Sequence, residues 1–327
     1  TWAQYIRFAN DVAEAGKKMT GKHVYPGGTY DIDYAYISTG NQFITWDEGE
    51  QKSKININND DFAMSVQFVG DLAIKYGFQT VEEQAQKSNR ELFADNQSAT
   101  TWCGAWDTNS LWEAPCDWDI LPTPVPSTSY DLTDVTAPAR EGSKNVTMLG
   151  SVCFGVYKGS KNKEAAYKLA EFLSTNEEAQ VYNYVEGMAV PNRVDMFDEY
   201  MKAELNDPQG MNRPQNRIVY KQHLENSGRR KTAYTYNEGN AWDTALLTNG
   251  EGKYAMYHVL LKDGRTSTYK PNYIVFDWAT GQMTTTPKSY DASTKDVLSG
   301  KELFEWLSDD IQRVLDKSNG KYKVYTE

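Results

Sequence analysis

Residues 160–173 of this 327-residue chain read SKNKEAAYKLAEFL and carry a clear helical signal. Their apolar side chains recur at the spacing of one helical face, so the spacing predicts an amphipathic helix over residues 162–174. An apolar run punctuated by glycine, residues 148–157, comes before it and predicts a buried strand. The face that the helix is expected to bury consists of Ala165, Ala166, Leu169, Ala170, Phe172 and Leu173.

Two more helices are predicted near the start of the chain. The first is expected over residues 1–15, with Thr1 as its N-cap and Gly16 as its stop. The second is expected to begin after an Asn59 cap and to stop at Gly77. In both segments the apolar residues keep a helical period, which is typical of surface helices that pack one face on a core.

The remaining segments are less regular. Residues 99–103 predict a short strand that runs into a tight turn at 104–107. Residues 123–144 are rich in Pro, Ser and Thr, and predict a loop or crossover. Hairpin character is expected over 254–277, and a last helix over 301–317.

Composition limits the function classes. The length favours two domains or lobes. The net charge is −11 and the longest basic cluster is residues 228–231, so no nucleic-acid partner is expected. No stretch approaches 18 apolar residues, so no membrane span is predicted. The chain opens without a basic-then-apolar signal segment, and it is expected to be a processed or trimmed product.

Aromatic residues are abundant, with 9 Trp and 22 Tyr. Amphipathic rings are common in carbohydrate sites, where a ring stacks on the apolar face of a sugar. They also fill cores and interfaces, so the enrichment alone leaves both readings open.

The side chains that usually hold metals are few and scattered. The three cysteines, Cys103, Cys116 and Cys153, show no metal-ligand spacing, and there are only three histidines. No metal site and no cofactor are therefore expected. An odd number of cysteines allows at most one disulfide, and whether a pair forms stays open.

Sequence motifs of common enzymes are absent. The chain has no Gly-x-Ser-x-Gly elbow and no glycine-rich phosphate-binding motif. A glycoside hydrolase needs only two carboxylates at the right separation, so that class stays an alternative. The acidic residues that lie beside a tryptophan or a turn are Asp47, Asp107, Asp119 and Glu238. A single surface carboxylate is commoner than a catalytic one, and we expect no catalytic residue.

Five short motifs occur in a characteristic order along the chain. They are TWAQY (1–5), FADNQSATTWCGAW (93–106), PTP (122–124), SKNKEAAYKLAEFL (160–173) and EEAQ (177–180). In this order they resemble the extracellular solute-binding proteins of ABC importers, the carbohydrate-type family that includes maltose-binding protein. The resemblance covers residues 1–192 and resumes at 240–242 and in the last helix.

The resemblance implies an α/β fold of the periplasmic-binding type, type II, in which mixed sheets are covered by helices in two lobes. It implies a C-terminal lobe made of residues 1–122 and 193–327, with an insert at 249–299 that is expected to be peripheral. Residues 123–192 are then the crossover and part of the N-terminal lobe. The family's first part of the N-terminal lobe has no counterpart in this chain.

The function implied by the resemblance is binding rather than catalysis. A protein of this family closes on a sugar or oligosaccharide in a cleft between its lobes and delivers it to a membrane permease. The resemblance implies an extracytoplasmic monomer, either in the periplasm or at the cell surface as a lipoprotein. Two alternatives stay open: a glycoside hydrolase, and a binding protein for a non-sugar solute such as a peptide, a polyamine or a metal.

The resemblance also points to residues of the ligand site. Trp106 follows the Gly104 turn and is expected to stack under a sugar, unless it is a core residue. Asp107 is expected either to accept hydrogen bonds from paired hydroxyls or to cap the next helix. The other expected contacts are Trp242 on the C-terminal lobe, Gln42 and Phe43 after a turn, Gly150 and Ser151 near the hinge, and Trp102 and Trp46, for which packing is the competing role.

Overall fold

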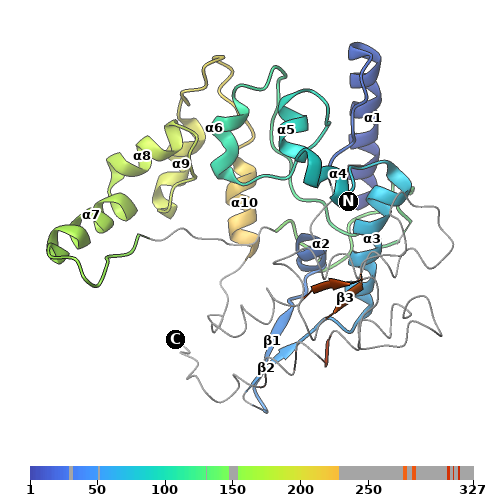
Figure 1. The fold of residues 1–327 in the computed structure, drawn as a ribbon, viewed down its shortest axis with the longest axis horizontal. Coiled ribbons are helices and arrows are strands. Elements are labelled where there is room, and N and C mark those ends of the chain that lie inside the picture. The colour runs from blue at the N-terminus through green and yellow to red at the C-terminus, as the bar shows by residue number, and fades with distance from the viewer. Residues whose placement is uncertain are drawn as a thin grey trace.

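A computed structural model describes residues 1–28, 32–50, 52–129, 131–146 and 154–227, with two short strands and positions 308, 309, 312 and 316 beyond them. Figure 1 shows helices joined by irregular loops, with the strands of the described residues in the lower half of the view. The helices are α1 (Trp2–Thr20), α2 (Ile32–Ser38), α3 (Asp60–Tyr76), α4 (Val81–Gln86), α5 (Asn89–Ala94), α6 (Thr108–Leu111), α7 (Lys163–Thr175), α8 (Glu177–Val185), α9 (Phe197–Lys202) and α10 (Ile218–Ser227), and two 3-10 turns cover Ala105–Asp107 and Val194–Met196.

The strands pair as two separate antiparallel hairpins. β1 (Ile44–Asp47) pairs with β2 (Lys52–Ile55), with Ile44 opposite Ile55. β3 (Val275–Asp277) pairs with β4 (Gln282–Thr284), inside the segment expected to be an insert. The rest of residues 249–299 lies outside the described residues, so the peripheral position of the insert stays a prediction.

Helix α1 begins where the sequence predicts and ends later. The Thr1 side chain and Gln4 form a capping box, which confirms the predicted N-cap. The predicted stop at Gly16 is wrong, because the helix continues to Thr20 and ends at Gly21 with a φ of 69°. Basic residues at 17 and 18 suit the carbonyl end of a helix, and Gly21 takes the left-handed conformation that closes it.

One hydrophobic core lies between α1, α2 and α3. The Trp2 and Phe68 rings stack at 4.2 Å with an interplanar angle of 7°. Phe62 also lies in this core and is fully buried. The Asn59 side chain accepts a hydrogen bond from the Phe62 N–H at the start of α3, and Gly77 ends that helix, as predicted.

Residues 99–103 do not form the predicted strand. A single bridge joins Tyr25 to Ser98, and the Ala99 N–H donates to the Tyr25 carbonyl. In a parallel ladder the next pairing residue of this segment would be Gly27, but its carbonyl accepts instead from the Gln79 N–H at 2.8 Å. The Pro26 carbonyl accepts from the Thr100 hydroxyl at 2.8 Å. The pairing therefore ends after one bridge.

A second hydrophobic cluster joins the residues around α6 to α8 and α9. The Tyr184 and Tyr200 rings lie 5.3 Å apart within it. A Cβ at Gly187 would lie 2.7 Å from the Trp112 ring, so glycine is the residue that fits at this position. The buried members of this cluster are Leu111, Trp112, Ala114, Trp118, Tyr184, Met196, Phe197, Tyr200 and Leu205.

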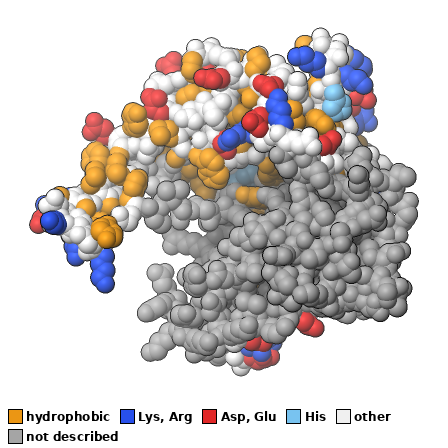
Figure 2. All heavy atoms as spheres, in the orientation of Figure 1, with side chains coloured by type: hydrophobic (Ala, Val, Ile, Leu, Met, Phe, Trp, Pro, Cys, Tyr) orange, Lys and Arg blue, Asp and Glu red, His pale blue; other side chains and the backbone are white. Residues whose placement is uncertain are grey.

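Helix α7 is confirmed as a helix, but its apolar face is exposed. None of its residues is buried, and its packing partner is α8. Leu169 is 58% exposed and Phe172 is 43% exposed, so the predicted burial of that face is wrong. Figure 2 shows apolar side chains gathered on the arm that α7 and α8 form at the left of the view. Just before α7, Phe154 and Tyr157 are exposed and in no strand, which contradicts the end of the predicted strand 148–157.

The loop at residues 123–146 packs along the first core. The Trp2 N–H donates to the Val125 carbonyl at 2.8 Å. Arg140 forms two hydrogen bonds with the Asp61 carboxylate at the start of α3, and this ion pair lowers the pKa of Asp61 against the opposing effect of burial. The segment is a loop, as predicted, and it is held in place by side-chain and backbone contacts.

Candidate functional site

The tight turn at Gly104 presents one large aromatic side chain. The Asp107 N–H donates to the Gly104 carbonyl at 3.0 Å, and Asp107 Oδ2 accepts from the Gly104 N–H at 3.3 Å. These two bonds close the turn in both directions. Trp106, at its tip, is 69% exposed. Since a tryptophan usually buries most of its area, an exposed one on a rigid turn is a candidate contact surface.

The Asp107 carboxylate is already engaged. Its Oδ1 forms an ion pair with Arg90 Nη1 from helix α5, and the residue is only 8% exposed. Helix α5 is itself fixed at its start by a capping box between Ser88 and Glu91. The arrangement supports neither a bidentate contact of Asp107 with hydroxyls nor a simple cap. It holds Arg90, which is half exposed, next to the Trp106 turn.

A second aromatic surface lies just before the turn. Trp102 stacks on Tyr34 of α2, with 5.4 Å between ring centroids and an interplanar angle of 27°. Both residues are partly buried. One face of the Trp102 ring therefore packs on Tyr34, and the remainder of the side chain is partly exposed.

Helix α10 contacts the segment that directly follows the turn. The Tyr220 side chain hydrogen-bonds with Thr108, the first residue of α6. Burial raises the pKa of Tyr220 to about 12, against the opposite effect of that hydrogen bond. The phenol is thus protonated at neutral pH and fixes α10 against the segment that carries Trp106.

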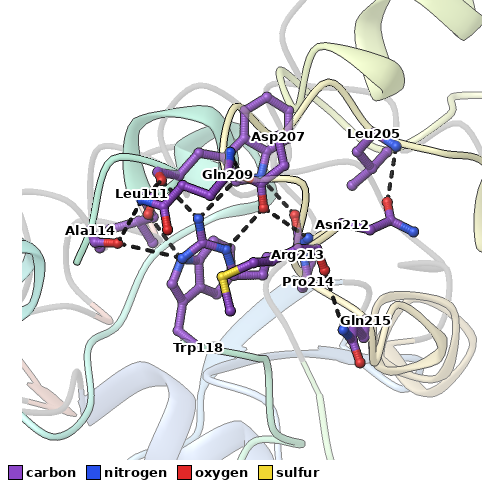
Figure 3. A network of polar contacts seen from close by, with 12 residues as sticks. Leu111, Ala114, Trp118, Leu205, Asp207, Gln209, Asn212, Arg213, Pro214 and Gln215 are labelled. Atoms are coloured by element: carbon purple, nitrogen blue, oxygen red, sulfur yellow. Dashed lines mark hydrogen bonds and ion pairs between the residues drawn. The ribbon is translucent and has the colours of Figure 1, made fainter. Parts of the chain in front are cut away.

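A buried arginine anchors the chain that follows α6 (Figure 3). Arg213 is fully buried and pairs with Asp207 at 2.9 Å. Its guanidinium also donates to the carbonyls of Trp112 and Cys116, each at 2.8 Å, and lies over the Trp118 ring. Burial raises the pKa of Asp207, but hydrogen bonds from Arg213 and from backbone N–H groups outweigh it and leave the pKa below its ordinary value.

The other predicted site residues are spread over the molecule. Gln42 is exposed on its turn, whereas Phe43 is a core residue, 5% exposed and packed on Tyr36 and Phe62. Trp46 lies on β1, and Figure 1 places that hairpin at the opposite end of the view from α6. Gly150, Ser151 and Trp242 lie outside the described residues.

The carboxylates that a hydrolase would need have structural partners. Asp47 pairs with Lys54, whose hydrogen bond lowers the pKa of that carboxyl to about 2. Asp119 accepts from the backbone N–H of Ile120 and of Asn216. Glu238 lies outside the described residues. The three described candidates, Asp47, Asp107 and Asp119, are therefore used in local structure.

Metal-binding clusters and membrane-spanning helices are both absent from the described residues. Among them, no group of three or more His, Cys, Asp or Glu side chains could hold a metal ion. No helix in the described part of the chain is both long and apolar enough to cross a membrane. In that part, Cys103 and Cys116 are free thiols, and Cys153 is not described.

Two residues of the site had no signal in the sequence. Arg90 reads as an ordinary charged helix residue, and Tyr34 as one of many tyrosines. Each is recognised as a site residue only from its contact with a residue distant in the sequence. Arg90 contacts Asp107, and Tyr34 contacts Trp102.

Comparison with known proteins agrees with the sequence motifs. A family model for bacterial extracellular solute-binding proteins matches residues 1–206. An ABC substrate-binding protein of Listeria monocytogenes, solved in complex with cycloalternan, has a similar structure with a TM-score of 0.59 and 16% sequence identity. The match covers 97% of this chain and 64% of that protein.

Two further sugar-bound structures are similar, with slightly lower TM-scores. T. maritima MalE3 with bound maltose gives a TM-score of 0.55, and the maltotriose-binding protein of Thermus thermophilus with bound maltotriose gives 0.54. Each is 16% identical, and each match covers 96% of this chain and 65% of the other protein. The chain thus spans about two thirds of the length of these neighbours. The likeness confirms the predicted fold, α/β of the type II periplasmic-binding kind, while the lobe boundaries stay a prediction.

Proposed function

Because the chain belongs to the family of bacterial extracellular solute-binding proteins, we propose that it binds a neutral sugar or oligosaccharide against Trp106 and delivers it to the permease of an ABC importer. The family is extracellular, and this protein acts outside the cytoplasm. We propose that it resides in the periplasm or is held at the cell surface as a lipoprotein.

The exposure of Trp106 on a closed turn is the observation that carries the proposal. A side chain that is 69% exposed contributes little to the core, yet the turn below it is held by two hydrogen bonds and by the Arg90–Asp107 ion pair. An exposed indole on a fixed turn offers a flat apolar face at low entropic cost, which suits the apolar face of a sugar ring.

Supporting evidence comes from the structural neighbours. All three were solved with a bound sugar, namely cycloalternan, maltose or maltotriose. At 16% identity their ligands do not transfer directly, so the sugar class remains part of the proposal. The mechanism proposed is closure of two lobes around the sugar, driven by contacts made only in the closed state.

Binding without chemical change is the second part of the proposal. The three described candidate carboxylates, Asp47, Asp107 and Asp119, are committed to ion pairs or backbone contacts. A glycoside hydrolase would need one protonated and one ionised carboxyl facing a common bond. We therefore propose that the sugar leaves the protein unchanged.

A thermal-shift panel tests this function. The full-length protein would be melted with maltotriose, cellotriose or mannotriose, and with spermidine and a neutral tripeptide as non-sugar solutes. A ligand present at 100 times its Kd stabilises the folded state by about 2.7 kcal/mol, so at least one trisaccharide should raise Tm by roughly 5 °C. A shift with only spermidine or the tripeptide, or with none of the five, contradicts the proposal. Trisaccharide that is cleaved during overnight incubation contradicts its non-catalytic part.

A further inference from the structure

We propose that Arg90 is the polar specificity residue of the sugar site, and that it selects a neutral sugar ring carrying two neighbouring hydroxyl groups. The inference rests on the proposed function, since it assigns a role to Arg90 beside the sugar that stacks on Trp106. The residue comes from α5, a different segment from the turn that carries Trp106.

The position of Arg90 is fixed by its neighbours. Its Nη1 pairs with Asp107 Oδ1, while Asp107 Oδ2 accepts from the Gly104 N–H. Asp107 directly follows Trp106 in the chain, so the guanidinium and the indole share one rigid support. In addition, the preceding residue, Asn89, is buried and hydrogen-bonds with Ser98, which fixes the start of α5.

The guanidinium keeps donors for a ligand. Within the described part of the chain, Asp107 is the hydrogen-bond partner of Arg90, and it takes up Nη1. Half of the Arg90 side chain, 49%, is exposed. A guanidinium has five N–H donors in a fixed plane, so several of them remain directed away from the carboxylate. Two donors held in one plane match two neighbouring oxygen acceptors.

Charge balance favours hydroxyls over a carboxylate as those acceptors. Asp107 neutralises Arg90, and the chain as a whole carries a net charge of −11. An acidic sugar would therefore meet a neutral pair on an acidic protein. Hydroxyl groups gain the hydrogen bonds without an added charge, and the Trp106 ring supplies the apolar contact.

The matched variants are Arg90→Lys and Arg7→Lys. Lysine keeps a positive charge beside Asp107 but lacks the planar set of donors. Arg7 pairs with Asp11 on the exposed surface of α1, so Arg7→Lys is the same change away from the site. Calorimetric titration would measure the affinity of the full-length protein and of both variants for maltotriose, cellotriose, mannotriose and trigalacturonic acid.

We expect Arg90→Lys to weaken binding of the best neutral trisaccharide about ten-fold or more, with Tm in the absence of sugar unchanged. Arg7→Lys should bind like the wild type. Analogues of that trisaccharide lacking one hydroxyl should include one that binds the wild type about ten-fold more weakly, while Arg90→Lys binds it and the parent sugar equally well.

Each other outcome contradicts a separate claim. If the neutral trisaccharides bind and Arg90→Lys binds them like the wild type, Arg90 has no specificity role and the proposed function stands. If every deoxygenated analogue loses the same factor in both proteins, the paired-hydroxyl contact is contradicted. If trigalacturonic acid binds most tightly and Arg90→Lys abolishes that binding, the residue recognises a carboxylate. If none of the four sugars binds the wild type, the proposed function fails and this inference with it.

Discussion

The indole ring of Trp106 lies directly across Gly104. A Cβ added at Gly104 would lie 2.3 Å from Cζ2 of the Trp106 ring, far inside van der Waals contact. Gly104 has an ordinary extended φ of −90°, so glycine is not needed here for an unusual backbone angle. It is needed because the ring occupies the space where a Cβ would lie. The exposed platform thus depends on the absence of one methyl group.

Replacing Gly104 by alanine should displace the platform without unfolding the protein. The atom that must move belongs to an exposed side chain, so the ring can swing away at little cost in stability. We expect Gly104→Ala to lower sugar affinity about ten-fold and to leave the urea midpoint of unfolding nearly unchanged. An equal change at Gly21, where φ is 69°, should behave oppositely, with affinity kept and stability reduced. Unaltered affinity in Gly104→Ala would contradict the placement of the ring.

The Arg213–Asp207 pair should be essential for stability. Both side chains are fully buried, so removing the arginine leaves an unpaired carboxylate and unsatisfied carbonyls in the interior. Arg213→Met should lower the free energy of unfolding by about 3–5 kcal/mol in urea titrations. Arg193→Met, which breaks the exposed Arg193–Asp195 pair, is the control and should leave it nearly unchanged. Similar free energies of unfolding for the two variants would contradict a stabilising role of the Arg213 network.

Acid should destabilise the protein through His223. Its Nε2 accepts from the Thr123 N–H at 3.1 Å, so this nitrogen must be unprotonated in the fold. Burial lowers the pKa of His223 below its ordinary value of 6.5, so the unfolded chain binds more protons than the folded one. The stabilisation is complete above pH 6.5 and is lost as pH falls below it.

The free energy of unfolding, measured between pH 8 and pH 5, tests this assignment. His223→Gln should show a flatter decline with falling pH than the wild type, because glutamine does not take up the proton. His23→Gln, a change at an exposed histidine near the end of α1, should follow the wild-type curve. Identical slopes for the wild type and both variants would assign the acid sensitivity to other groups.

The exposed face of α7 should tolerate truncation that the core does not. Phe172 is 43% exposed, whereas Phe62 is fully buried between α2 and α3. Phe62→Ala should cost about 3–5 kcal/mol of unfolding free energy, and Phe172→Ala less than about 1 kcal/mol. Phe172→Ala should also reduce binding of the dye ANS to the folded protein. A large loss of stability in Phe172→Ala would show that this face is covered.

The parts of the fold that were predictable from the sequence depend on local signals. The Thr1 and Asn59 caps and the Gly77 stop were identified correctly, because a cap is formed by residues three or four apart. The burial of α7 was predicted incorrectly for a physical reason. A helical period shows which face is apolar, but it does not show whether another element covers that face.

The site was predictable only in part. The Gly104 turn in the sequence singles out Trp106, and its exposure excludes the core role that the sequence left open. Phe43 was expected at the ligand but lies in the core, because its neighbours Tyr36 and Phe62 come from other helices. Arg90, to which we assign a role only by proposal, carries no signal in the sequence, because its placement depends on Asp107, seventeen positions away on another element. Contacts between segments cannot be read from a single sequence.

Calorimetric titration of Trp106→Ala tests whether a sugar stacks on Trp106. The variant should bind the best trisaccharide of the panel about ten- to hundred-fold more weakly than the wild type, because stacking contributes on the order of 1–3 kcal/mol. Its Tm without sugar should be unchanged, since the ring is 69% exposed. Tyr167→Ala removes another exposed aromatic side chain, on α7, and should keep full affinity. Unchanged affinity in Trp106→Ala, with or without a drop in Tm, would contradict this stacking.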